Sequence, residues 1–177
     1  EVNDKPVYFA IRGKNWVFAD SVLFNMVQRT VYFQRKFWND YAIDRFTVSL
    51  VPLRIENEDS YSYGGTALTN CFASFATPVK NIQLSKLLYL YNHELMHYWI
   101  GNSIKVSDPE ELMYWFSEGF TDYFTHLNLY ENGFINKQKY QQSIDSLFAV
   151  HYNNPAHESA NTVIKEKFWT DPVIQKL

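Results

Sequence analysis

The sequence has very little cysteine, no long apolar run and no cluster of basic residues. Its single cysteine, Cys71, excludes an internal disulfide framework, and a lone thiol in an apolar segment is most often a small buried side chain. No apolar stretch reaches the roughly 18 residues that a membrane-spanning helix needs, so we expect no span in this segment. A net charge of −3 without any basic run argues against nucleic acid as a partner.

The composition is that of a soluble globular domain. With 177 residues, 46% hydrophobic and 20% charged, the chain can bury one sizeable core. It starts at Glu1 without an initiator or a signal peptide, so we expect residues 1–177 to be a single domain excised from a longer protein with flanking domains. The compartment stays undecided, and an extracytoplasmic location is left open.

Residues 93–97 read H-E-L-M-H and fit the zinc-hydrolase pattern H-E-x-x-H, inside an apolar segment long enough to be a helix. Residues four apart share one helix face, so His93 and His97 can reach one metal. Glu94 then flanks the open coordination position as the candidate catalytic carboxylate. Because so short a pattern arises by chance in roughly one sequence per few hundred, the interpretation needs a third ligand.

Glu118 is the candidate third ligand, within a second apolar, helix-compatible run at residues 115–124. Two histidines and one glutamate leave one tetrahedral position open for water, which is the catalytic form of a zinc site. Asp122 follows one helical turn later on the same face, where its carboxylate can accept the free ring N–H of a ligand histidine. The pattern therefore predicts one Zn²⁺ per chain.

Hydrophobic periodicity divides the chain into a sheet-containing half, residues 1–80, and a helical half, residues 81–177. This order of strands followed by helices predicts an α+β domain. The strand that follows Gly64 and Gly65 is expected to be an edge strand, to which an extended peptide can add as a further strand. The expected strands cover residues 7–11, 45–53 and 67–76, and the expected helices cover residues 20–39, 83–102, 109–131 and 137–152.

Aromatic residues are unusually frequent, at 18% of the chain. Many lie beside the two motifs, where rings at helical spacing usually fill a core. We expect most of this set to be buried and a minority to line a substrate cleft. The set includes Tyr91, Trp99, Trp115, Phe120 and Tyr123.

The two motifs resemble the gluzincin metallopeptidases, and most closely the catalytic domain of the M1 aminopeptidase family. The matching segments are H-E-x-x-H with its continuation Y-W-I-G-N at residues 98–102, and S-E-G-F at residues 117–120. Y-G-G-T-A-L-T-N at residues 63–70 falls where the family has a Gly-x-Met-Glu-Asn strand. The resemblance implies zinc-dependent hydrolysis of a peptide substrate. It also implies a thermolysin-like catalytic domain with a small, mostly antiparallel sheet and an active-site edge strand.

The same resemblance indicates which residues contact substrate. Thr69 stands where the family carries the glutamate that binds a substrate's α-amino group, so we expect an aminopeptidase-like enzyme with altered recognition of the N-terminus. Acidic side chains of Glu56, Glu58 or Asp59 are an alternative source of that charge. The predicted substrate-binding residues are Gly64, Gly65, Thr66, Ala67, Thr69 and Asn70.

Several alternatives share these sequence features. An endopeptidase or an epoxide hydrolase would use the same site, and a degenerate homologue would bind peptides without catalysis. In the resembling family a tyrosine stabilises the oxyanion, and its position would fall just beyond Leu177, so we expect the domain to be truncated at its C-terminus. The spacing from His97 to Glu118 is longer than is usual in that family, which predicts a longer loop around residues 106–109.

Overall fold

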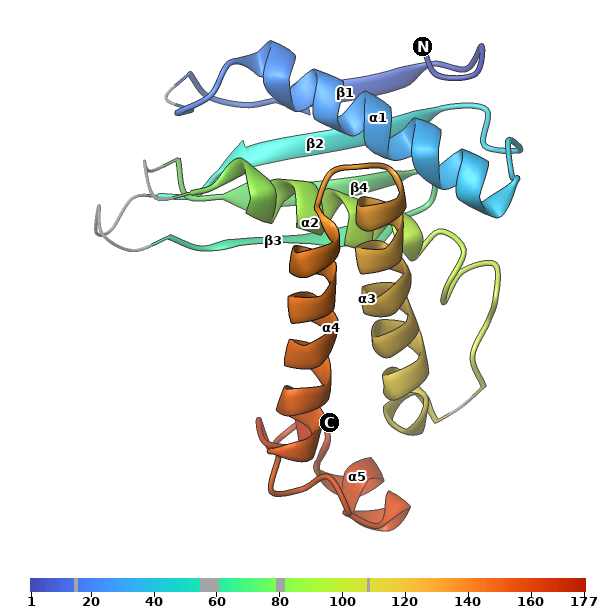
Figure 1. Cartoon of the computed structure of the whole chain (residues 1–177), viewed down its shortest axis with the longest axis vertical. Helices are drawn as coiled ribbons and strands as arrows, with labels where there is room; N and C mark the ends of the chain where they lie inside the picture. The colour runs from blue at the N-terminus through green and yellow to red at the C-terminus, as the bar shows by residue number, and fades with distance from the viewer. Residues whose placement is uncertain (15, 55–60, 79–81, 108) are drawn as a thin grey trace. The chain divides into compact units, whose positions relative to one another are not determined.

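The structure is a computed structural model, and it describes residues 1–14, 16–54, 61–78, 82–107 and 109–177. The chain divides into two compact units, Glu1–Tyr98 and Trp99–Leu177 (Figure 1). The acidic side chains predicted as alternative amine-binding groups, Glu56, Glu58 and Asp59, lie outside the described residues. That residues 1–177 form one catalytic domain stays a prediction.

The first unit contains a four-stranded sheet with the order β1-β2-β4-β3. Strand β1 (Val7–Ile11) pairs in parallel with β2 (Phe46–Pro52). Strand β2 also pairs in parallel with β4 (Cys71–Ala76), whereas β3 (Tyr63–Leu68) pairs antiparallel with β4. The prediction of a mostly antiparallel sheet is therefore wrong. A helix joins β1 to β2, and such a crossover returns the chain in the parallel direction.

Strands β3 and β4 form a hairpin where one strand over residues 67–76 was predicted, so that prediction is also wrong. Leu68 pairs with Cys71, and Thr69 and Asn70 make the turn between them. Asn70 has a φ of 54°, in the left-handed region that asparagine tolerates better than most residues. Among the described strands β3, which carries the glycine pair, lies at the edge of the sheet, whereas β4, which takes up most of the strand expected at the edge, lies inside it.

Two helices cover one face of this sheet (Figure 1). Helix α1 (Asp20–Trp38) and helix α2 (Leu84–Met96) have apolar faces at helical spacing. Tyr91 of α2 is fully buried, with its ring centroid 6.2 Å from that of Phe9 and 5.1 Å from that of Phe72. Burial raises the pKa of Tyr91 to about 12, and the nearby Ser74 hydroxyl lowers it by less. These rings fix the buried side of α2 against the sheet.

Helix α2 is shorter than the predicted span of residues 83–102. The helix ends at Met96. The His97 amide still donates to the carbonyl of His93 at 3.4 Å, whereas the Tyr98 amide donates to the carbonyl of Leu95, one residue closer than in an α-helix. Gly101 follows with a φ of +97°, which a residue with a side chain rarely adopts. His97 therefore lies at the C-cap of α2, still with helical backbone angles.

The regular elements in the described part of the second unit are helices, and an isolated bridge joins Ile100 to Ile104 (Figure 1). Residues Glu110–Leu112 form a 3-10 turn before α3 (Tyr114–Glu131), so the predicted helix from residue 109 is interrupted at Met113. Helix α4 (Lys137–Tyr152) is confirmed with its predicted bounds, and the Asn136 side chain caps it by accepting from the Lys139 amide at 2.8 Å. The short helix α5 (Asn161–Lys167) and a 3-10 turn at Ile174–Lys176 complete the unit.

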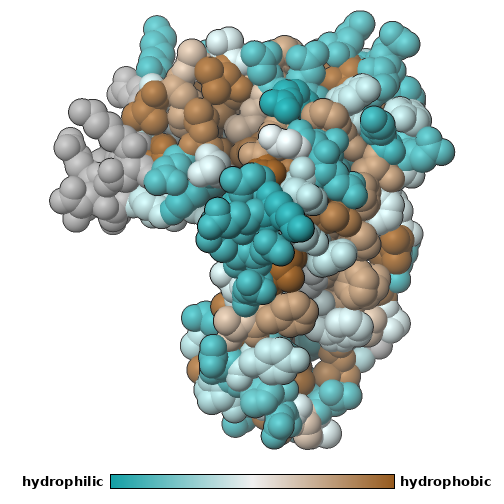
Figure 2. Space-filling view, viewed as in Figure 1, coloured by the Kyte–Doolittle hydropathy of each residue, from teal (hydrophilic) through white to brown (hydrophobic). Residues whose placement is uncertain are grey.

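The aromatic residues divide between core and surface. Tyr91 and Trp99 are buried as predicted, but Trp115 is 60% exposed, and Phe120 and Tyr123 are also exposed. Helix α3 turns its threonine and leucine side chains inward instead, so the expectation of buried rings is wrong for these three. None of the described helices is long and apolar enough to cross a membrane. The face seen in Figure 2 intersperses hydrophilic and hydrophobic residues.

Leu50→Ala tests which face of the sheet carries the core. Leu50 in β2 is 0% exposed, so its truncation should lower the free energy of unfolding by about 2–5 kcal/mol. The neighbouring Val51 points to the other face and is 39% exposed, so Val51→Ala should change that free energy by about 0.5 kcal/mol or less. Denaturant unfolding of both variants measures this. Equal losses would contradict the one-sided burial of β2.

Candidate metal centre and catalytic carboxylate

His93 and His97 lie one turn apart on α2, on the side that faces away from the buried core. Their Nε2 atoms are 3.1 Å apart, and their rings are nearly perpendicular, with centroids 4.8 Å apart. Both are partly exposed, whereas Asn92, Leu95 and Met96 around them are buried. The two imidazoles thus direct nitrogen atoms at one point, as ligands of a shared cation do.

Glu94 lies against the edge strand of the sheet. A Cβ atom added at Gly65 would be 3.4 Å from Cγ of Glu94 and 3.0 Å from the carbonyl oxygen of Ala73. Any larger residue at this position would therefore push on either the β4 backbone or the Glu94 side chain. The second glycine of the pair, Gly64, faces the opposite way, where an added Cβ would be 2.7 Å from the Phe75 ring. The glycine pair allows two close approaches, one on each face of β3.

Glu118 and Asp122 lie one turn apart on α3, in the second unit, and both are partly exposed. Tyr114 lies one turn before Glu118. Burial raises the pKa of Tyr114, and the carboxylates of Glu118 and Glu110 raise it further. The Tyr114 hydroxyl therefore keeps its proton at neutral pH, and it adds a hydrogen-bond donor to this end of α3.

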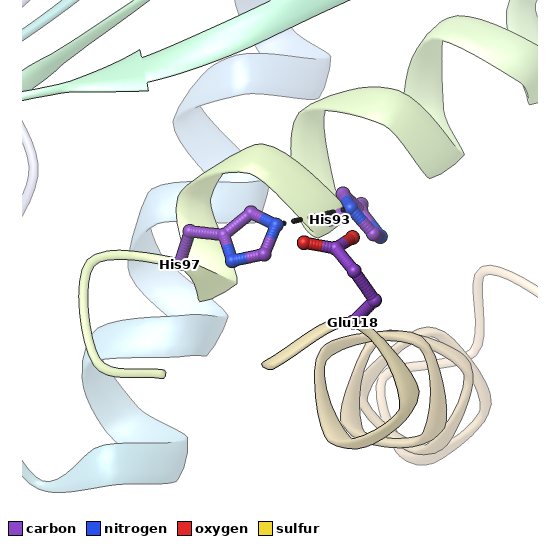
Figure 3. A group of neighbouring side chains, drawn as sticks. All are labelled: His93, His97 and Glu118. Carbon is purple, nitrogen blue, oxygen red and sulfur yellow. Dashed lines mark hydrogen bonds between the residues drawn. The ribbon is translucent and has the colours of Figure 1, made fainter. Parts of the chain in front are cut away.

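The structure groups the three predicted metal ligands. One ligand atom from each of His93, His97 and Glu118 lies within 4.8 Å of the other two, and Figure 3 draws the three side chains. Two imidazole nitrogens and one carboxylate oxygen make a donor set that zinc accepts in proteins. The group is therefore compatible with a metal site.

The predicted substrate-binding residues fall on two different parts of the hairpin. Residues i and i+2 of a strand share a face, so Gly65 and Ala67 face the same side as Glu94, while Gly64 and Thr66 face the other. Thr69 and Asn70 lie in the turn rather than on a strand. That the substrate contacts these residues stays a prediction for all six of them, Gly64, Gly65, Thr66, Ala67, Thr69 and Asn70.

Two features of the site were missed in the sequence. The close packing of Gly65 against Glu94 depends on the hairpin register, which the single predicted strand did not provide. A buried polar contact between α1 and α2 was also missed, although Asn92 is a polar residue in the otherwise apolar run L-L-Y-L-Y-N that precedes the motif. That residue type at a buried helix position is a usable signal, because buried amides need specific partners.

Comparison with known proteins gives a family-model match and similarity to solved structures. Residues 86–166 match the family model described as M61 glycyl aminopeptidase. Among solved structures, the chain is similar to the crystal structure of an aminopeptidase N family protein from Idiomarina loihiensis, with a TM-score of 0.66 and 17% identity over 93% of this chain. The chain spans only 31% of that protein. No curated protein sequence matches significantly.

These findings confirm the predicted resemblance to the gluzincin class of zinc metallopeptidases. Within that class, the matching family model is M61 rather than M1, so the particular resemblance to M1 is not confirmed. The structural likeness confirms an α+β fold with a small sheet and helices of the kind found in an aminopeptidase family. The family match supports a peptidase.

Proposed function

We propose that this chain carries the active site of a zinc-dependent peptidase of the aminopeptidase type. The observation that carries the proposal is the grouping of His93, His97 and Glu118, whose ligand atoms lie within 4.8 Å of one another. The match of residues 86–166 to the M61 glycyl aminopeptidase model supports the reaction class independently of that geometry. The proposed substrate is a peptide.

His93, His97 and Glu118 are the residues that would hold the metal. Three protein ligands leave one tetrahedral position open, which distinguishes catalytic from structural zinc sites. Zinc, when bound, supplies Lewis acidity that polarises a carbonyl and lowers the pKa of water toward neutrality. Asp122, one turn after Glu118, would accept the free ring N–H of a ligand histidine and so fix its tautomer.

Glu94 is the proposed general base. Its carboxylate accepts a proton from the attacking water and returns that proton to the leaving amine nitrogen, so one group serves both halves of the hydrolysis. Two observations support this role. Glu94 adjoins His93 on α2, and it packs against the backbone of the edge strand at Gly65. A substrate lying along β3 would therefore pass directly beside this carboxylate.

The free edge of β3 is the proposed peptide-binding strand. Its partner β4 uses one edge, and among the described residues no strand pairs with the other. An extended peptide can hydrogen-bond to such an edge as an added strand, with alternate side chains on the two faces. This mode fixes the peptide's direction and depth through backbone contacts, without a charged anchor.

Recognition of a free N-terminus is proposed to be weak. An α-amino group binds within one residue of the scissile bond, hence close to the part of β3 beside Glu94. Thr69 is four residues beyond Gly65, or about 13 Å along an extended chain. Ala67 is the nearer residue on the same face as Gly65, and its methyl group offers no charge. Neither position supplies a carboxylate for the amine.

His97→Ala should remove most of the metal. Loss of one of three protein ligands leaves too few donors to hold zinc against dilution. Elemental analysis of the purified protein measures the stoichiometry, with His151→Ala in α4 as the histidine control, which should keep one zinc per chain. Stoichiometric zinc in the His97→Ala protein would remove this residue from the ligand set.

Glu94→Gln should keep the metal but slow peptide hydrolysis by about 10²–10⁴. The amide has nearly the shape of the carboxylate and cannot accept the proton from water. Turnover of a peptide by the zinc-loaded, full-length protein measures the effect, and Glu131→Gln at the exposed end of α3 is the matched control. A wild-type rate from the Glu94→Gln enzyme would exclude the general-base role.

Acetylating the N-terminus of a peptide substrate should reduce kcat/KM only slightly. Loss of a charge-assisted contact between an amine and a carboxylate would cost about 1.5–3 kcal/mol, which corresponds to a reduction of roughly 10–150-fold, and we expect a smaller effect than this. Ala67→Glu should restore discrimination in that range, because it places a carboxylate on the Glu94 side of β3. Thr69→Glu, in the turn, should not. Complete loss of cleavage on acetylation of the wild-type substrate would instead show that another residue binds the amine.

A further inference from the structure

A row of hydrogen bonds joins α1 to α2 behind the two histidines. Asn92 Nδ2 donates to Thr30 Oγ1 at 3.1 Å. Gln34 Nε2 donates to the Asn92 carbonyl oxygen at 2.6 Å and to its Oδ1 at 3.2 Å. Trp38 Nε1 donates to Met96 Sδ at 3.1 Å. We call these five residues the α1–α2 seam. Its members are spaced by one helical turn on each helix.

The polar part of the seam is completely buried. Gln34 and Asn92 are 0% exposed, and Thr30 is 1% exposed. The Asn92 amide uses both of its N–H groups, since Nδ2 also donates to the Leu88 carbonyl at 2.9 Å, and its oxygen accepts from Gln34. Gln34 Oε1, by contrast, is buried without a hydrogen-bond partner among the described residues. Apolar side chains of similar size would avoid that cost, so stability alone does not account for the seam.

Each α2 member of the seam immediately precedes one proposed metal ligand. Asn92 is followed by His93, and Met96 is followed by His97. Successive residues on a helix are turned by a fixed angle, so holding Asn92 and Met96 toward α1 also sets the direction of both imidazoles. Apolar contacts are non-directional and tolerate sliding, whereas a single buried asparagine can fix the register of two packed helices.

The required precision favours a directional contact. A rotation of α2 by 20° would move a side-chain tip about 6 Å from the helix axis by roughly 2 Å. Metal–ligand distances must hold to about 0.2 Å. A small rotation that an apolar interface would tolerate is therefore too large for a metal site.

We propose that the α1–α2 seam, through Thr30, Gln34 and Asn92, positions His93 and His97 for metal binding. The inference rests on the proposed function, because it takes these histidines as metal ligands. Thr30, Gln34 and Asn92 are positioning residues that act through α2 and do not touch the metal. Removal of the polar contacts lowers metal affinity and changes the coordination geometry, even where the fold is retained.

The experiment replaces the polar contacts by apolar side chains of similar size, in the full chain with Thr30→Val, Gln34→Leu and Asn92→Leu together. We expect a melting temperature of the metal-free protein equal to or above that of the wild type. Zinc affinity, measured by chelator competition, should fall about 10-fold to 100-fold, in the range seen when groups that orient ligands are lost. The visible spectrum of the Co²⁺-loaded protein should change, which reports geometry without any activity assay.

Val27→Ala is the stability control. Val27 is buried on α1 and takes part in none of the seam's hydrogen bonds, so its truncation should lower the melting temperature but leave zinc affinity and the Co²⁺ spectrum as in the wild type. The triple variant should show the opposite pattern, with an unchanged or higher melting temperature and weaker zinc binding. If the seam only stabilised the fold, zinc affinity would instead change in the same direction as the melting temperature, both in the triple variant and in Val27→Ala.

A single-site pair decides the matter if the triple variant does not fold. Thr30→Val removes the hydroxyl that accepts from Asn92 at almost constant volume, and Thr30→Ser keeps it. Weaker zinc binding in Thr30→Val with recovery in Thr30→Ser supports the proposal. Wild-type affinity and spectrum in Thr30→Val, and in the triple variant where it folds, overturn it. A wild-type protein that binds no zinc overturns the proposed function itself, which is a distinguishable result.

Discussion

The two-sided character of α2 is the constraint on which the site depends. One side carries Leu87, Leu90, Tyr91 and Leu95 into the core, and it is held by the rings of Phe9 and Phe72. The other side carries the histidines and Glu94, partly exposed. Because α2 and its C-cap residue His97 serve both purposes, any change in how the apolar side of the helix packs is transmitted to the direction of the polar side. A rigid, densely packed interior suits this task, since it resists small displacements.

The glycine pair of β3 is the counterpart of that helix on the sheet. Gly65 lets the edge strand approach Glu94 closely, while Gly64 leaves room for the Phe75 ring on the opposite face. Glycine usually destabilises the interior of a strand. Two successive glycines in the edge strand β3 therefore indicate that the close approach of neighbouring side chains matters more there than strand propensity. No strand in the described part of the chain pairs with the outer edge of β3, so the proposed peptide would add there, beside the Glu94 carboxylate.

The sequence predicts the parts of this structure that depend on local chemistry. Periodic apolar residues predict α1 almost to the residue, and helix start and stop signals predict α4, whose first turn is capped by Asn136. The ligand grouping also follows from local spacing on α2 and a recognisable segment around Glu118. Strand direction and the β3–β4 hairpin were predicted wrongly, because pairing is decided between segments distant in sequence. The exposed rings of Trp115 and Phe120 were likewise misjudged, since periodicity alone does not say which face of a helix is covered.

The α1–α2 seam illustrates why a site of this kind is not optimised for stability alone. Hydrocarbon side chains that pack as densely could replace its buried amides, and they would remove Gln34 Oε1, which has no hydrogen-bond partner among the residues that the structure describes. The hydrogen bonds of Asn92 nevertheless select one rotation and one register of α2 among those that an apolar interface permits. The proposed site needs that selection because two of its three metal ligands, His93 and His97, and its general base, Glu94, all come from α2 and its C-cap. An error in the direction of this helix displaces these three residues together.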